Sequence, residues 1–177
     1  MNAPPWSAQT ELAAGASHVV IPAGEGWSFW QPQPAQGYVT VQLTPANMPY
    51  DHFSAGVQML PPGCSVREHG HQRNHELVHV TAGTGICTID GTTYELKPGA
   101  TVLFGRNARH TILNTGEEPM LFFWVFMPPG LENWFHAIGQ PRTPGEPQPP
   151  PFPRPPGVED AMAAQHFLPP KPEPSQP

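Results

Sequence analysis

Between Tyr38 and Met127 the chain alternates apolar and polar residues in short runs. In Tyr38–Thr44 (YVTVQLT) every second residue is apolar. This period of two is typical of a strand with one buried face. The same reasoning predicts further strands at Ser54–Leu60, Ser65–His71, Glu76–Val80, Gly85–Ile89, Thr92–Leu96, Thr101–Phe104 and His110–Asn114.

Turn signals and one long apolar run complete the pattern. Asp90 and Gly91 lie between two of the predicted strands, and Asp-Gly in this position predicts a tight hairpin. Met120–Met127 (MLFFWVFM) is apolar throughout and predicts a strand buried on both faces. Short, regularly spaced strands with Gly, Pro and Asp between them predict an all-β sandwich or barrel.

After Met127 the pattern changes to a helical period. Within 128–139 four large apolar residues recur at helical spacing and predict a short amphipathic helix ended by Gly139; they are Leu131, Trp134, Phe135 and Ile138. Residues 140–157 are too rich in proline for helix or strand and predict an extended chain. We expect this segment to lie as a strap over the barrel or a neighbouring subunit, and recognition by SH3-like modules is the alternative.

The chain therefore divides into three parts. Residues 1–37 form an N-terminal arm with edge strands, 38–127 form the barrel, and 128–177 form the short helix and the proline-rich C-terminal strap. A weak final helix is predicted at 158–167, and the tail 168–177 is expected to be mobile.

Composition narrows the classes of function. The net charge is -6 and only 12% of the 177 residues are charged, which argues against a nucleic-acid partner. Cys64 and Cys87 are the only cysteines, too few for a disulfide framework, so we expect two reduced, buried thiols. No run reaches the roughly 20 apolar residues that span a bilayer, and the N-terminus lacks a signal-peptide pattern, so a cytoplasmic location is expected.

The densest chemistry lies in Arg67–Gly83 (REHGHQRNHELVHVTAG). On a strand, His69 and His71 face the same side, and a turn returns the chain so that Glu76 comes beside them. Together with His110, they predict a site of three imidazoles and one carboxylate for a divalent ion. The alternatives are a histidine pair on a surface strand and a hydrogen-bonded His110. His75 and His79 do not share the parity of Glu76 and are not predicted to be ligands.

These residues resemble the two motifs of the cupin superfamily. The first, G-x5-H-x-H-x4-E-x6-G, is matched at every fixed position between Gly63 and Gly83. The second, G-x5-P-x-G-x2-H-x3-N, begins at Gly99 and keeps His110, but has Gly105 in place of proline and Asn107 in place of glycine. The resemblance covers roughly 55–127. It implies a double-stranded β-helix, a jelly-roll barrel holding one metal ion, with ligands His69, His71, Glu76 and His110.

The two departures concern a loop beside the ligand strand. Gly105 loosens this loop, and Asn107 accepts a left-handed conformation better than most residues, so the ligand is expected to survive. Residues 128–145 also resemble the segment that follows the barrel in quercetinase-like single-domain cupins.

Cupins include oxygenases, isomerases, lyases, decarboxylases and binding proteins, so fold alone leaves the function open. The supply of aromatic residues favours a hydrophobic small molecule as substrate, and an Fe(II)-dependent dioxygenase with Glu76 as base is the leading hypothesis. The alternatives are a non-redox enzyme with Zn, Mn or Ni and a non-catalytic binding module. Phe104, Arg106 and Arg109 are the candidate substrate contacts, and a homodimer or higher oligomer is expected.

Overall fold

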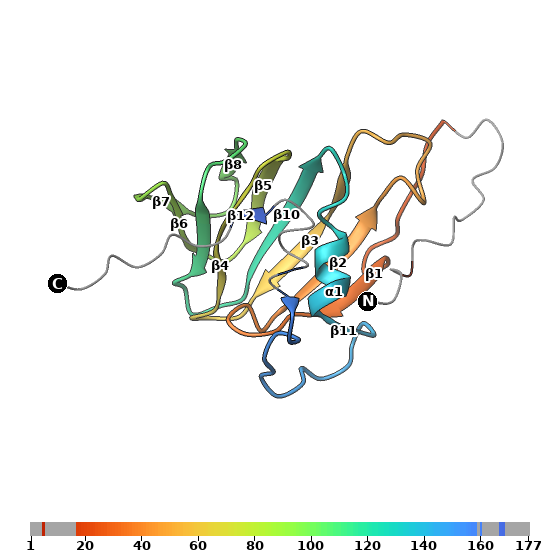
Figure 1. The fold of residues 1–177 in the computed structure, drawn as a ribbon. Coiled ribbons are helices and arrows are strands. Elements are labelled where there is room, and N and C mark those ends of the chain that lie inside the picture. The colour runs from red at the N-terminus through yellow and green to blue at the C-terminus, as the bar shows by residue number, and fades with distance from the viewer. Residues whose placement is uncertain (1–4, 6–16, 159, 161–166, 169–177) are drawn as a thin grey trace.

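A computed structural model describes residue 5, residues 17–158, residue 160 and residues 167–168. Two antiparallel sheets face each other (Figure 1). The larger has the order β11-β1-β2-β3-β10-β5-β8 and the smaller the order β12-β4-β9-β6-β7. Chain neighbours are therefore often separated in the sheets, as expected of a double-stranded β-helix. The predicted jelly-roll fold is confirmed, with the C-terminal additions described below.

The strands follow the predicted runs closely. Their bounds are β1 Trp27–Trp30, β2 Tyr38–Leu43, β3 Ser54–Leu60, β4 Ser65–His71, β5 His75–Ala82, β6 Gly85–Ile89, β7 Thr92–Leu96, β8 Thr101–Phe104, β9 His110–Asn114, β10 Met120–Met127, β11 Gln140–Pro141 and β12 Phe167–Leu168. The hairpin between β6 and β7 is made as predicted. Asp90 and Gly91 have φ values of 48° and 91°, so the turn uses the left-handed conformations that favour Asp-Gly.

Strand β10 differs from its prediction. Its side chains alternate between fully buried and half-buried along its whole length instead of being buried on both faces. The strand is central in the larger sheet, between β3 and β5, but only one face of that sheet packs into the interior. Phe122, Trp124 and Phe126 point into that interior. The outer residues are apolar although they remain partly exposed.

Close packing at the centre depends on one glycine. A Cβ atom at Gly56 of β3 would come within 2.1 Å of the Thr40 carbonyl oxygen and 2.6 Å of the Trp124 ring. The Trp124 ring in turn packs against Phe126 and Phe135, at centroid distances of 4.7 and 5.2 Å. Gly56 thus lets β2, β3 and β10 approach closely enough to fill the core without a void.

The predicted helix is shorter than expected. Helix α1 spans Asn133–Ile138, because Gly130 has a φ of 121° and the chain turns once more before the helix begins. The buried Glu132 carboxylate accepts hydrogen bonds from the Gly130 amide and the Ser54 hydroxyl, which fixes this turn to β3. All four apolar residues of the predicted stripe are buried, and α1 lies across the larger sheet (Figure 1).

The proline-rich segment contacts this chain's own barrel. The Gln33 amide donates to the Phe152 carbonyl at 2.9 Å, and the Trp30 indole N–H donates to Glu146 at 2.6 Å. The Arg154 guanidinium stacks on the Trp134 ring at 5.3 Å. The strap therefore covers α1 and the start of the larger sheet. Most of the predicted final helix and tail lie outside the described residues.

Two further features concern the rest of the chain. Cys64 and Cys87 are both free and buried, as predicted. Burial, and secondarily the charge of Glu76, raises the pKa of Cys87 to about 12.

No helix among the described residues is long and apolar enough to span a bilayer.

Candidate metal centre

Four side chains from three strands meet between the two sheets. His69 and His71 come from β4, Glu76 from β5 and His110 from β9, and their ligand atoms all lie within 4.8 Å of one another. His69 and His110 are direct partners across the β4–β9 pair, so sheet register alone brings them together. The sequence prediction of this group is matched by its geometry.

The turn between β4 and β5 positions Glu76. The Asn74 side chain is buried and its amide donates to the Pro128 carbonyl at 2.5 Å, which ties the turn to the end of β10. Gly70, between the two histidines, packs against another part of the chain: a Cβ there would lie 3.1 Å from the Ala108 carbonyl oxygen. That contact brings the loop before β9 close to β4.

Asn107 holds this loop in place. It adopts a φ of 66°, in the left-handed region, at the position where the motif normally has glycine. Its backbone N–H donates a hydrogen bond to the His71 carbonyl at 2.8 Å. The departure from the second motif therefore leaves the position of His110 intact.

Hydrogen bonds orient the rings. The Nδ1 atoms of His69 and His110 contact the carbonyls of Arg67 and Ala108, at 2.8 and 3.0 Å. A carbonyl can only accept, so both rings carry a proton on Nδ1 and leave Nε2 to face the cluster. The Nδ1 atom of His71 is buried and has no partner in the described part of the chain, so this ring is not tied to a carbonyl.

The contacts of Glu76 test whether a metal ion fits. Its Oε2 atom lies 2.9 Å from His71 Nε2 and 3.2 Å from His110 Nε2. A neutral His110 ring has one N–H, and Nδ1 already uses it, so its Nε2 lone pair would point at a carboxylate. A divalent cation in place of a proton resolves this conflict for His110 and also neutralises Glu76. Three imidazoles and one carboxylate suit Fe, Zn, Ni or Cu. The residues present therefore fit a metal ion.

The electrostatics keep the ligands in their binding forms. Burial, and secondarily the neighbouring His110 and His71, lowers the pKa of His69 well below its usual value, so its Nε2 lone pair is available near neutral pH. Burial acts to raise the pKa of Glu76, but the neighbouring His110 and His71 rings outweigh it and hold that pKa below the usual range. Glu76 is thus ionised at neutral pH.

We expect metal affinity to fall as the pH is lowered from about 6.5 to 4.5, on the acid side of the usual histidine pKa. Protons compete with the ion for the Nε2 atom of His69, and because the pKa of this ring is lowered, the competition begins only on the acid side of the usual value of about 6.5. Each proton displaced on binding weakens affinity by up to about tenfold per pH unit. Glu76, with its lowered pKa, stays ionised throughout this window and contributes no loss. Zinc titration with a competing chelator at several pH values measures the slope, and proton release in weak buffer checks it. An affinity independent of pH across this window would contradict the histidine ligands.

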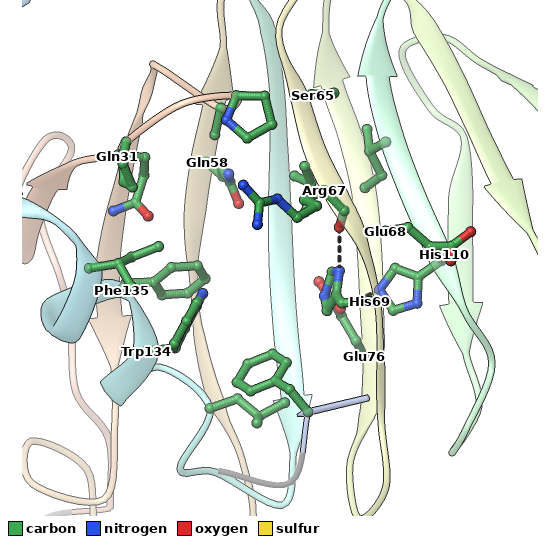
Figure 2. A pocket seen from close by; sticks show the side chains of 18 of the residues that line it. Gln31, Gln58, Ser65, Arg67, Glu68, His69, Glu76, His110, Trp134 and Phe135 are labelled. Carbon is green, nitrogen blue, oxygen red and sulfur yellow. Dashed lines mark hydrogen bonds and ion pairs between the residues drawn. The ribbon is translucent and has the colours of Figure 1, made fainter. Parts of the chain in front are cut away.

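The cluster lines a cavity between the sheets, shown in Figure 2. The other walls are largely apolar and come from the interior faces of both sheets, from α1 and from the C-terminal segment; they include Val66, Ile112, Phe122, Phe126, Leu131, Trp134, Phe135, Ile138 and Phe167. The Phe167 ring packs 5.2 Å from His71 and 5.3 Å from Trp134, and β12 pairs with β4 beside it. The metal cluster thus adjoins a space suited to an apolar ligand.

The three predicted substrate residues do not line this cavity. Phe104 is fully buried and stacks on the His110 ring, with centroids 3.8 Å apart and planes at 10°, so it supports a ligand. Arg106 is exposed, and Arg109 is half-buried with its backbone amide bonded to Asp90. Neither arginine is among the cavity-lining residues.

Sequence reasoning missed the polar residues that do line it. Arg67 of β4 shares the parity of His69 and His71, and this signal was readable from spacing. Gln58 of β3 is 7% exposed and faces inward. A single glutamine among apolar residues was harder to interpret, because either face of β3 carries apolar side chains.

The remaining histidines of the motif lie elsewhere. His75 begins β5, and His79 contacts the Thr101 hydroxyl at 2.8 Å through Nδ1. Neither belongs to the cluster of candidate ligands found among the described residues.

Residues 56–126 match the family model described as "Cupin domain". This segment of the chain is similar to the cupin domain. The matched segment runs from β3 to β10 and includes all four clustered residues. The likeness of 128–145 to quercetinase-like cupins lies outside the matched segment and stays a prediction.

Similar proteins agree with this assignment. The chain is 34% identical over 88 residues to "Protein SchB" of Streptomyces halstedii, covering 49% of this chain and 64% of that protein. It is 36% identical over 80 residues to an L-ectoine synthase of Hyphomonas neptunium, covering 44% and 58%. A crystal structure described as a predicted oxalate decarboxylase from Thermotoga maritima superposes with a TM-score of 0.57 at 23% identity, covering 63% of this chain and 100% of that one. The cupin core spans less than two thirds of these curated relatives.

Proposed function

We propose that this protein is a metal-dependent enzyme that acts on a small, partly apolar molecule, as an Fe(II) dioxygenase with an aromatic or enolisable substrate. The observation that carries the proposal is the group of three imidazoles and one carboxylate lining an aromatic-walled cavity. His69, His71, Glu76 and His110 would hold one ion per chain. Four protein ligands on an octahedral ion leave positions for small molecules.

The chain's own groups have distinct roles in this scheme. Bound Fe(II) would supply the electrons for reaction with dioxygen. Glu76 uses Oε2 for both histidine contacts, and no hydrogen bond to Oε1 is found in the described part of the chain. Oε1 is therefore placed to accept the proton of a substrate hydroxyl. The rings of Phe122, Phe126 and Trp134 exclude water and orient a planar substrate.

A non-redox reaction is the second candidate. The observation that favours it is the likeness to a relative named L-ectoine synthase, a name that does not denote an oxygenase. In that case the same four residues would hold Zn, Mn or Ni, and the ion would supply Lewis acidity to a carbonyl. Glu76 would again take the proton, so the metal and not the base distinguishes the two candidates.

We expect protein purified without added metal or chelator to contain iron. The Fe(II)-loaded protein should consume oxygen with at least one of catechol, a hydroxyketone and 3-hydroxyflavone, measured with an oxygen electrode. The Zn-loaded protein is the matched control, because it keeps the ligands and cavity and lacks the electron source. Nitric oxide should give a high-spin signal with the Fe(II) protein, as expected of an open coordination position.

The opposite results are equally informative. An iron-loaded protein that binds no nitric oxide and consumes no oxygen with the whole panel contradicts the dioxygenase, and the non-redox candidate then leads. A protein that binds no divalent ion at all contradicts both.

A further inference from the structure

We propose that Arg67 and Gln58 form an anion subsite in the cavity, separate from the metal ligands, which selects substrates carrying a carboxylate. Arg67 comes from β4 of the smaller sheet and Gln58 from β3 of the larger sheet. Both line the cavity, and Figure 2 shows the guanidinium and the amide pointing into it. This inference rests on the proposed function, because it names the substrate class of the same site.

The first supporting observation is the state of Gln58. Its side chain is 93% buried, since only 7% is exposed, yet its amide makes no hydrogen bond in the described part of the chain. The amide lines the cavity, so a ligand or water there can satisfy its polar atoms, as is usual for inward-facing polar groups. Leucine or valine at this inward position of β3 would serve the core better. The amide is therefore placed for a ligand.

The second observation is the state of Arg67. Its guanidinium has no ion pair or hydrogen bond among the described residues, and the residue lines the cavity from an exposed position on β4. A guanidinium presents its donors in a planar fork that matches a carboxylate. Because the Arg67 side chain is exposed, it stands at the mouth of the cavity, where an incoming anion meets it first.

The other charged residues that line the cavity do not oppose the binding of an anion beside Arg67 and Gln58. Arg154 adds a second cation, which the strap holds over the Trp134 ring. Glu68 also lines the cavity, and in Figure 2 it lies on the far side of His69 from the Arg67 guanidinium. With Glu76 offset by its histidines and a bound ion, the lining is positive on the side of Arg67 and Gln58.

The remaining walls specify what the anion is attached to. Phe122, Phe126 and Phe135 present aromatic rings next to the polar pair. A flat apolar group against these rings and a carboxylate on Arg67 fit the cavity together. The inferred substrate is thus an aromatic or unsaturated acid, whose reacting end faces the metal cluster and whose carboxylate faces Arg67.

The test compares benzoate with its neutral isostere benzamide on Zn-loaded protein, by calorimetry or Trp fluorescence. The wild-type protein should bind benzoate about tenfold more tightly than benzamide, and rising salt should reduce the difference. R67Q should remove most of it, R67K should restore part, and Q58L should weaken benzoate by about threefold. The matched control is R73Q, which loses the same charge from an exposed turn outside the cavity.

Several results would overturn the subsite. Equal binding of benzoate by R67Q and wild type would do so, as would equal binding of benzoate and benzamide by the wild-type protein. Benzoate binding that needs the ion but not Arg67 would mean that the carboxylate coordinates the metal. Loss on R106Q with no loss on R67Q would favour the loop arginine instead. Metal binding is measured separately. If the protein takes up no divalent ion but still binds benzoate through Arg67, the subsite is upheld and the proposed function is contradicted.

Discussion

Replacing His110 by alanine should strip the ion and lower the melting temperature by roughly 10 °C. The ring is 1% exposed and stacks on Phe104, so its removal leaves a cavity as well as an incomplete site. An ion present at 1,000 times its Kd stabilises the fold by about 4 kcal/mol, and about 1 kcal/mol shifts the melting temperature by 2–4 °C at this length.

Metal analysis and thermal melts with and without chelator measure the two losses separately. Chelator should lower the melting temperature of the wild type but leave the alanine variant unchanged. His79→Ala is the matched control, because this half-exposed ring contacts the Thr101 hydroxyl and lies outside the cluster. It should keep its metal and melt within about 2 °C of the wild type. A His110→Ala protein with a full metal complement would show that the ligand assignment is wrong.

The clustering of the four candidate ligands could be predicted because it depends on local rules. His69 and His71 share a strand face by parity, and Glu76 follows within one turn. His110 required the second motif, since only the pairing of β4 with β9 makes it the partner of His69. The alternation of apolar and polar residues within a strand does not say which distant strand it pairs with. The resemblance to the second cupin motif supplied His110, which periodicity alone could not.

The lining of the cavity was harder to predict for the same reason. On β3, Ala55, Val57 and Met59 form an apolar face, yet the opposite face with Gln58 points inward. Both faces are substantially covered, so hydrophobicity did not distinguish them. The inward face contains Gly56 because Trp124 fills the space beside it.

In the loop before β9, closeness to His110 along the chain did not predict which residues line the cavity. Arg106 and Arg109 lie beside His110 in the chain, but neither residue lines the cavity. Arg67 of β4, which stands two residues before His69, does line it. Even spacing along a strand is therefore a better guide to cavity-lining residues than proximity in a loop, although the loop supplied the predicted substrate residues.

Glu76→Gln should keep the ion at saturating metal concentration and lose most of the turnover. Glutamine has the shape of glutamate and can still offer an oxygen to the ion and the two histidines, so the site can assemble. The neutral amide binds a cation less tightly, and we expect the metal affinity to fall by about 10–100-fold. It also has no carboxylate to accept a substrate proton, which should lower turnover by about 10²–10⁴-fold.

Metal affinity is measured by titration for the variant and the wild type. Oxygen uptake is then compared at full metal loading, with whichever of catechol, the hydroxyketone and 3-hydroxyflavone reacts fastest with the wild type. Glu95→Gln is the control, since this exposed residue of β7 loses the same charge outside the cavity. If Glu76 were only a ligand, turnover would recover once the variant is saturated with metal. If it is the base, saturation restores the ion but not the rate, because Oε1 of glutamate is the atom that takes the proton and the amide cannot replace it. Wild-type turnover in the saturated variant would therefore remove Glu76 from the chemistry and leave it as a ligand alone.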